Sequence, residues 1–459
     1  MADHGSRRMG VMGKPQNTKK TLKRILTYLL DYKVQLLIVF IAILLSSASG
    51  IAGTYFLKPL INDYIVPAIG ETNPDLSGFI AMLVILGVIY LIGVISSYLY
   101  NRLMINIATG TLYRIRKDLF NHMQKLPIRF FDAHTHGELM SHFTNDTDTL
   151  REMMSQGVPQ LISSTVTVLG VFIMMIILSP ILTLVVIAML VVMLLVVTKI
   201  GKRTAAYFKK QQEAIGRVNG YVEEMIEGQK VVKVFTHEET VKHEFNEYND
   251  KLCKSATSAN TFANILMPIM GNLSYMLYAI TAAGGAALTI MGRMDLGTIA
   301  SFLQYTRSFS QPITQMSQLF NAVLNALAGA ERIFNLIDQE EEVDKGDITL
   351  VELKPDSESW EWKCPGKDGG FDLIRLKGDV RFEDVTFSYD GEKTVLNNVS
   401  LYAKPGQKIA FVGSTGAGKT TITNLLNRFY DIPDGKIIYD GIPINRIRKG
   451  DLRRSLGMV

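Results

Sequence analysis

One long apolar stretch constrains the fold of this chain more than any other feature. No charged residue occurs from Met153 to Thr198, whereas a single membrane span needs only about 20 apolar residues. Ser179 and Pro180 interrupt the stretch, so it predicts a hairpin of two spans, Val158–Leu178 and Ile181–Ile200. We therefore expect a polytopic α-helical membrane protein rather than a set of soluble domains.

Further apolar segments complete a predicted set of six transmembrane helices. They are Gln35–Leu57, Phe79–Tyr100, Leu266–Ile290 and the more polar Leu296–Leu319. The last is interpreted as a span rather than a buried soluble helix, because the fifth span needs a return partner. The predicted membrane domain covers residues 21–335 and follows a disordered tail at residues 1–20. At its start, Thr21–Lys33 has the apolar spacing of an amphipathic helix lying on the membrane surface.

Basic residues give the predicted spans an orientation. They gather after the second and fourth spans, as Arg102, Arg114, Arg116, Lys117, Lys125 and Arg129, and as Lys202, Arg203, Lys209 and Lys210. The opposite loops hold few of them, so the positive-inside rule predicts a cytosolic N-terminus and a cytosolic C-terminal region in the cell membrane. The net charge of +5 is too small to indicate a nucleic-acid partner. The two cysteines, Cys253 and Cys364, make no disulfide framework.

The predicted cytosolic loops are longer than ordinary connections. Asn101–Gly157 and Gly201–Ala263 keep helical spacing, for example at Ile115, Leu119 and Met123. At about 1.5 Å per residue, such helices would extend tens of Å into the cytosol. Each would carry a turn at its tip that another domain could bind.

A complete phosphate-binding motif lies near the end of the chain. Gly413–Thr420 matches G-x-x-x-x-G-K-[ST], with a predicted strand Lys408–Val412 before it and a helix over Thr421–Leu426 after it. This strand, glycine loop and helix order predicts the start of an α/β phosphate-loop (P-loop) domain, truncated here, whose nucleotide site binds ATP with Mg²⁺.

Each residue of the loop has an expected role. The backbone of Gly413, Ser414, Thr415, Gly416, Ala417 and Gly418 would surround the phosphates. Lys419, the catalytic candidate, would reach the β- and γ-phosphates, and the Thr420 hydroxyl would bind Mg²⁺. Thr421 would contact the α-phosphate.

An aromatic residue ends a second predicted strand upstream of the loop. Val380–Tyr389 alternates, with a slip of phase between Phe382 and Val385 that indicates a bulge. From the residues alone, Tyr389 is either a core side chain or a ring that stacks on adenine.

These motifs together resemble the ATP-binding cassette (ABC) exporter family, in which a membrane domain is fused to a nucleotide-binding domain. Pro127–Asp132, Gly137–Leu139 and Asn145–Asp148 are similar to the first cytosolic loop of the family, and Gly228–Glu239 to the second. Ala328–Phe334 is similar to the exit from the sixth span. Within the family, the nearest likeness is to one subunit of bacterial heterodimeric multidrug exporters.

The resemblance implies a function and a partner. It implies ATP-driven efflux of hydrophobic or amphipathic compounds by a dimer of two such half-transporters, a heterodimer being favoured over a homodimer. It also implies that Tyr389 stacks on adenine. The residues that would transmit motion between the domains are Phe131, Asp132, Gly137, Glu138, Leu139, Tyr221, Glu224 and Phe235.

The sequence departs from the family pattern in two places. Residues 378–459 match only the first part of the nucleotide-binding domain, without its signature motif, catalytic glutamate and switch histidine. We expect a fragment of a longer transporter that does not hydrolyse ATP by itself. The linker or insertion at residues 336–377 is longer than usual from Gln339 to Lys377. We expect a surface excursion with an added hairpin near Ser359–Cys364, inert rather than regulatory.

Two groups of polar residues raise further alternatives. Gln304, Arg307 and Gln311 share one face of the sixth span, where they would line the substrate pathway or make a structural hydrogen bond to a neighbouring helix. His134, His136 and His142 lie in the first cytosolic loop, and no acidic or cysteine set joins them there, which argues against a zinc site.

Other functions compete with efflux of varied compounds. A dedicated lipid, peptide or siderophore exporter would have the same sequence features. Two different classes are a phosphate-loop regulator or GTPase with a membrane anchor, and a non-catalytic truncated membrane scaffold. The long cytosolic helices argue against a simple anchor.

Overall fold

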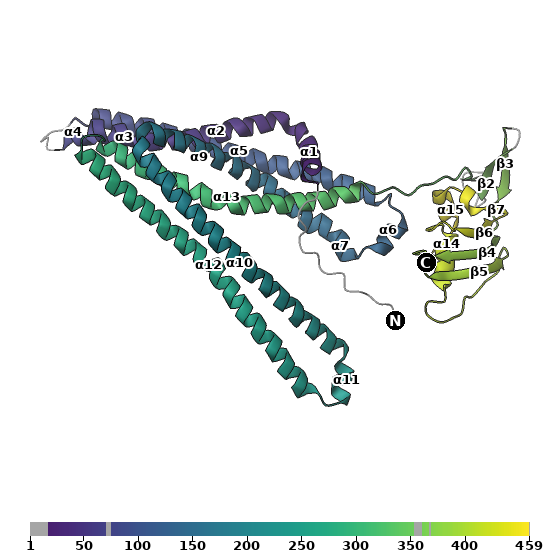
Figure 1. Cartoon of the computed structure of the whole chain (residues 1–459). Coiled ribbons are helices and arrows are strands. Elements are labelled where there is room, and N and C mark those ends of the chain that lie inside the picture. The colour runs from purple at the N-terminus through teal and green to yellow at the C-terminus, as the bar shows by residue number, and fades with distance from the viewer. Residues whose placement is uncertain (1–16, 70–74, 353–359, 367–368, 459) are drawn as a thin grey trace. The chain divides into compact units, whose positions relative to one another are not determined.

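A computed structural model describes residues 17–69, 75–352, 360–366 and 369–458 of the chain (Figure 1). It divides into two compact units. The first consists of Met1–Arg24, Thr111–Leu150 and Ala326–Val459, and the second of Ile25–Gly110 and Arg151–Asn325.

Long helices build the second unit, as the apolar runs predict. They are α2 (Lys33–Tyr55), α5 (Ser77–Met123), α9 (Val158–Leu178), α10 (Pro180–Glu227), α12 (Glu238–Ile290) and α13 (Leu296–Ile337). Among the described residues, five helical stretches are long and apolar enough to cross a membrane, and they contain the first five predicted spans. The more polar α13 is not among them, so its role as the sixth span stays a prediction.

Apolar side chains from distant segments fill the centre of this bundle. Val171 and Met175 of α9 pack with Val186 of α10 and with Leu277 of α12. On α13, Tyr305 is fully buried, and its hydroxyl donates a hydrogen bond of 2.7 Å to the carbonyl of Ile51 on α2. The apolar segments therefore recognise one another through packing and a few buried polar contacts.

Two of the helices extend far beyond their apolar halves. Figure 1 shows α10 and α12 side by side, joined at the tip by the short α11 (Gln229–Val234). The rings of Tyr207 and Phe262 stack between them with centroids 4.8 Å apart. Helix α5 likewise continues to Met123. The predicted helical character of both long loops is confirmed.

Shorter helices form the ends and connections of the described part. Helix α1 (Thr18–Leu29) confirms the amphipathic helix but begins within the range predicted for the tail, whose residues 1–16 lie outside the described part. The remaining ones are α3 (Leu57–Pro59), α4 (Val66–Ala68), α6 (Ile128–Ala133), α7 (His136–Ser141), α8 (Thr147–Glu152), 3₁₀ turns at Leu30–Tyr32 and Ile444–Arg446, and π turns at Leu60–Ile65, His142–Asp146 and Met153–Gly157.

The C-terminal region is built on an antiparallel sheet of strand order β5-β4-β6-β7. Its elements are β4 (Val380–Ser388), β5 (Thr394–Ala403), β6 (Asp434–Tyr439), β7 (Ile442–Pro443), α14 (Lys419–Leu426) and α15 (Lys449–Ser455). The register shifts between Phe382 and Val385, which confirms the predicted bulge. Asp384, inside the bulge, has a left-handed φ of 47°.

The predicted insertion folds as a second sheet of β1 (Thr349–Glu352), β2 (Trp360–Pro365) and β3 (Phe371–Arg375). The hairpin is confirmed by the antiparallel pairing of β2 with β3, although Ser359 lies outside the described residues. We expected this insertion to lie on the surface, and this is wrong for one face of the sheet. On that face Trp362 is 0% exposed and packs in the same core as Phe382. Its indole N–H donates to Asp440 at 3.1 Å.

The predicted strand Lys408–Val412 is not present. These residues have no regular structure and are exposed, Val412 to 94%. A buried strand needs hydrogen-bonding neighbours, and no strand in the described part of the chain pairs with this segment. A short apolar run therefore does not tell whether a segment will find a strand to pair with.

Candidate nucleotide-binding site

The phosphate loop, Gly413–Thr420, turns tightly into helix α14. Gly416 and Gly418 have φ values of 86° and 84°, a region that only glycine adopts without strain. A Cβ on Gly418 would also lie 2.7 Å from a methyl carbon of Leu396. The loop is otherwise exposed, so its backbone N–H groups are accessible at the positive end of α14.

The ammonium group of Lys419 closes over the loop. Its Nζ donates hydrogen bonds to the carbonyls of Gly413 at 2.9 Å and Ser414 at 2.8 Å. The positive charge of Lys419 therefore lies at the entrance to the loop. A bound phosphate group would replace the two carbonyls as the partner of this ammonium group.

The hydroxyl groups after Lys419 differ in environment. Thr420 is exposed, whereas Thr421 is 5% exposed. Among the described residues, no group of three or more His, Cys, Asp or Glu side chains could hold a metal ion. The Thr420 hydroxyl nevertheless fits Mg²⁺, because this ion usually takes few protein ligands and completes its shell with phosphates and water.

Tyr389 lies against the first turn of α14. Its hydroxyl donates to Thr421 Oγ1 at 3.1 Å and accepts from Asn424 Nδ2 at 3.3 Å. Its ring meets Phe387 and Tyr430 edge to face, each with centroids 4.9 Å away. Strand β4, which ends one residue before Tyr389, thus brings an aromatic ring next to the phosphate loop.

The residues predicted from the first cytosolic loop lie on two short helices, which we call the coupling segment (residues 128–141). Phe131 and Asp132 are on α6, and Gly137, Glu138 and Leu139 on α7. Thr135 caps α7 by accepting the N–H of Glu138 at 3.2 Å. Leu139 is buried, whereas Asp132, Gly137 and Glu138 are exposed.

A buried ionic cluster next to this segment was not predicted. Asp146 is 4% exposed and accepts hydrogen bonds from Nε of Arg332 at 3.1 Å and from Nη2 of the same side chain, while His142 Nδ1 lies 2.8 Å away. Burial alone would raise the pKa of Asp146, but the hydrogen bonds from His142 and Arg332 outweigh it and lower the pKa below its usual value. The sequence analysis identified the segment that contains Asp146 and the segment that contains Arg332. No local pattern shows that residues so far apart in the sequence form a pair.

The other predicted coupling residues lie at the tip of the α10–α12 hairpin. The Tyr221 hydroxyl donates to the Val241 carbonyl at 3.1 Å and so joins the two helices. Glu224 is exposed on α10, and Phe235, just after α11, is 67% exposed. An aromatic side chain this exposed at a helical tip is available for contact.

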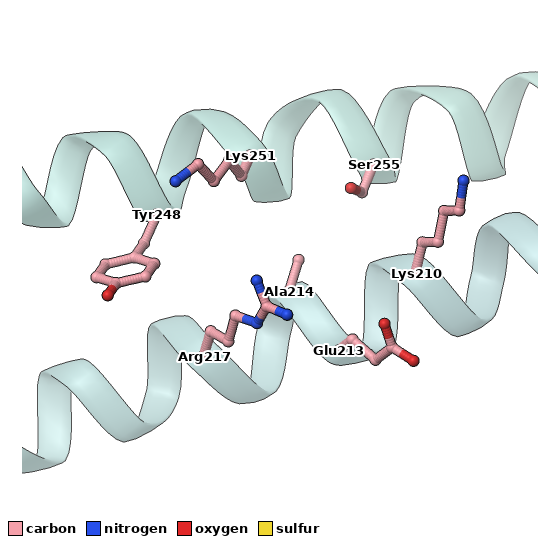
Figure 2. A pocket seen from close by; sticks show the side chains of 7 residues that line it. All are labelled: Lys210, Glu213, Ala214, Arg217, Tyr248, Lys251 and Ser255. Atoms are coloured by element: carbon pink, nitrogen blue, oxygen red, sulfur yellow. The ribbon is translucent and has the colours of Figure 1, made fainter.

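A groove of about 220 Å³ lies between α10 and α12, farther from the tip of the same hairpin (Figure 2). Its charged lining is Lys210, Arg217, Lys251 and Glu213. Figure 2 shows Arg217 extending from α10 into the space between the helices, opposite Tyr248 of α12. The groove is basic, and no glycine is among the residues that line it.

The predicted pathway residues share one side of α13. Gln304, Arg307 and Gln311 are exposed, whereas Phe302 and Tyr305 on the opposite side are fully buried. The bundle of the same unit is therefore packed against the other face of this helix.

Comparison with known proteins identifies the family. Residues 36–313 match the model of the ABC transporter transmembrane region, and residues 396–459 match that of the ABC transporter. An uncharacterized ABC transporter ATP-binding protein of Bacillus subtilis, YfiC, is 37% identical over 97% of this chain and 69% of its own length. The chain belongs to the ABC transporter family.

Other relatives of this ABC transporter subunit have more specific names. A fatty acid ABC transporter ATP-binding/permease protein of Mycobacterium bovis is 33% identical over 81% of the chain, which covers 55% of that protein. An ATP-dependent lipid A-core flippase of Yersinia pestis is 26% identical over 97% of the chain and 72% of its own length. The subunit is thus a membrane-spanning component of an ATP-driven transporter, and its ATP-binding region lies in the second match.

Proposed function

We propose that this ABC transporter subunit exports hydrophobic or amphipathic compounds from the cell as one half of a dimer, with a heterodimer favoured. The observation that carries the proposal is the phosphate loop. Gly416 and Gly418 allow its tight turn, the ammonium group of Lys419 lies at its entrance, and α14 starts beside Tyr389. This arrangement suits the phosphates and the base of ATP.

Individual residues take up the nucleotide in this proposal. Lys419 would bind the β- and γ-phosphates, and Thr420 would bind the Mg²⁺ that accompanies them. Thr421 accepts a hydrogen bond from Tyr389, which leaves its own proton free for the α-phosphate. The ring of Tyr389 would stack on adenine.

The substrate pathway is assigned to the exposed face of α13. An arginine in the middle of a span is costly in lipid and is normally turned toward a cavity or a partner helix. Arg307 is exposed, with Gln304 on the same side, which favours the pathway over a structural hydrogen bond within the subunit. The partner subunit would supply the opposite wall.

Transport in inside-out membrane vesicles tests the function. Vesicles that contain the transporter should accumulate an amphipathic fluorescent dye when ATP and Mg²⁺ are added. Lys419→Ala should abolish accumulation, whereas Lys436→Ala, an exposed lysine of β6, should leave it unchanged. Uptake that continues in the Lys419→Ala variant would contradict the proposal.

A second test separates the pathway from the ATP site. Arg307→Leu should change which dyes are accumulated and leave the affinity for ATP unchanged. An identical transport profile in the variant would count against the pathway assignment.

Export of a dedicated lipid is the second candidate. It is favoured by the names of two relatives, a fatty acid transporter and a lipid A-core flippase. Vesicles that move labelled fatty acid or a labelled phosphoglycolipid, but none of several cationic and neutral dyes, would support this candidate over efflux of varied compounds.

A further inference from the structure

Tyr430 contacts the coupling segment from the ATP-binding region. It follows α14 closely in the sequence and is half-buried. Its hydroxyl donates a hydrogen bond to the carboxylate of Asp132 on α6. The two residues are 298 positions apart, and Asp132 already belongs to the residues assigned to coupling.

The ring of Tyr430 is held on its other side by aromatic neighbours. Tyr389 lies at 4.9 Å with an interplanar angle of 87°, and Phe387 at 5.6 Å with an angle of 64°. Phe387 and Tyr389 are themselves edge to face at 4.9 Å. Three rings in mutual edge-to-face contact leave each one little freedom to rotate alone, because such contacts fix both position and tilt.

The contacts continue to the phosphate loop. Tyr389 is hydrogen-bonded to Thr421 and Asn424, both on α14. An unbroken series of contacts therefore runs from Asp132 through Tyr430 and Tyr389 to Thr421. Every link is a hydrogen bond or an edge-to-face ring contact.

We infer that Tyr430 is a positioning residue that links the coupling segment to the nucleotide site through Tyr389. A shift of Asp132 moves the Tyr430 hydroxyl, the ring follows, and the face that Tyr389 offers to the base changes with it. The link acts in both directions, because two sites that share a coupling free energy change each other's affinity equally.

The hydroxyl of Tyr430 is suited to this task. Burial and the neighbouring Asp132 carboxylate both raise its pKa well above the usual value. It therefore stays a neutral donor at physiological pH, and the hydrogen bond to a carboxylate is of the stronger, charge-assisted kind. This inference rests on the proposed role of the phosphate loop and Tyr389 in binding ATP.

Nucleotide binding in a double-mutant cycle tests the link. The chain is purified into lipid nanodiscs and titrated with a fluorescent ATP analogue. Tyr430→Phe keeps the ring and removes the hydroxyl, and Asp132→Asn keeps the shape and removes the charge. Each should weaken binding by about fivefold to tenfold, at the lower end of the usual coupling between two sites. The double variant should be no weaker than either single variant.

Matched controls separate this link from general effects. Glu152→Gln removes an exposed acid of α8, outside the coupling segment, and Tyr402→Phe removes a hydroxyl from an exposed tyrosine of β5. Both should bind as the unchanged chain does. Asp132 is exposed, so its substitution should also leave the thermal unfolding midpoint unchanged.

Two outcomes would overturn the link. One is unchanged affinity in Asp132→Asn, which stays decisive even if Tyr430→Phe unfolds. The other is strictly additive losses in the double variant. Lys419→Ala distinguishes a different failure, because retained affinity in that variant would remove the proposed nucleotide site itself.

Discussion

Gly418 carries two separate constraints at the entrance to α14. Its backbone has a left-handed φ, and its Cα faces a methyl group of Leu396. The first constraint concerns strain in the backbone, and the second concerns space in the core. A single position of the phosphate loop is thus tied to strand β5, on the sheet beneath it.

Substitution of two glycines should separate the constraints. Gly441 has a similar φ of 81° with nothing near its Cα, whereas Gly418 has both the φ and the contact. Gly441→Ala should lower the free energy of unfolding by about 1 kcal/mol. Gly418→Ala should lower it by a further 1–3 kcal/mol, roughly the cost of overpacking. Both tryptophans lie in β2, so urea unfolding followed by tryptophan fluorescence reports on this unit. Equal losses would contradict the steric contact.

Asp146 should give the stability of the first unit a dependence on pH. The pKa of Asp146 is lower in the folded chain than its ordinary value of 3.8. Its ionised form therefore stabilises the fold fully above about pH 4, and this contribution is lost as the pH falls below 4 through the pKa of the folded state. Asp146→Asn should cost about 1–3 kcal/mol at pH 7, because Arg332 loses its charged partner. The difference from the unchanged chain should shrink between pH 5 and pH 3.

The neighbouring acid provides the comparison. Asp148 is 58% exposed and lies 3.8 Å from Arg116, so Asp148→Asn should change stability by less than about 0.5 kcal/mol. A pH-independent loss in Asp146→Asn would mean that packing, and not the charge, is responsible.

At the scale of elements, local patterns predicted what local forces decide. Hydropathy gave the first five spans and both long helical extensions, because a run such as Val158–Leu178 needs no distant partner to become a helix. Lys408–Val412 failed for the opposite reason, since a strand depends on neighbours that the pattern does not name. The loop and α14 were correct, because glycine geometry and helix capping are local.

The inserted sheet shows the same limit from another side. Alternation predicted the hairpin at β2, but it did not tell whether either face would find a cover. The ring of Trp362 lies 5.8 Å from that of Tyr439, centroid to centroid. Ile442 and Ile444, which are also distant in the sequence, belong to the same core. The pairing of Asp146 with Arg332 was beyond reach for the same reason, as it joins residues 186 positions apart.

Truncation of Trp362 should destabilise the ATP-binding region strongly. Trp362→Ala leaves a cavity in the shared core and removes one of the hydrogen-bond donors to Asp440, which predicts a loss of about 3–5 kcal/mol. Trp360→Ala, on the same face of the strand but only partly buried against that core, should cost less. Thermal unfolding followed by circular dichroism measures both. Similar small losses would restore the picture of an inert surface insertion.

At the scale of the whole molecule, helix length argues that part of the chain lies outside the bilayer. Helix α12 has 53 residues, or about 80 Å at 1.5 Å per residue, and the apolar core of a membrane is about 30 Å thick. The N-terminal half of α12, with the exposed Cys253, should therefore lie in water. The distribution of basic residues predicts that this water is the cytosol.

Labelling of the two natural cysteines can test that orientation. Cys253 is exposed, whereas Cys364 is buried and burial raises the pKa of its thiol, which makes it unreactive. A membrane-impermeant maleimide should label Cys253 in inside-out vesicles and should not label it in intact cells. Labelling in intact cells would reverse the topology, and denatured protein, in which both thiols react, serves as the reference.

The connector after α13 has a practical consequence for building chimeric transporters. The N–H of Glu342 donates to the Lys125 carbonyl at 2.8 Å, and its carboxylate accepts from Arg453 at 2.7 Å and from Lys449 at 3.3 Å. A hybrid that joins this membrane region to the ATP-binding region of a relative has no clean seam at this residue. A junction placed before Glu342 takes this position and its basic partners from one protein, whereas a junction placed after it faces Glu342 with the relative's residues in place of Lys449 and Arg453.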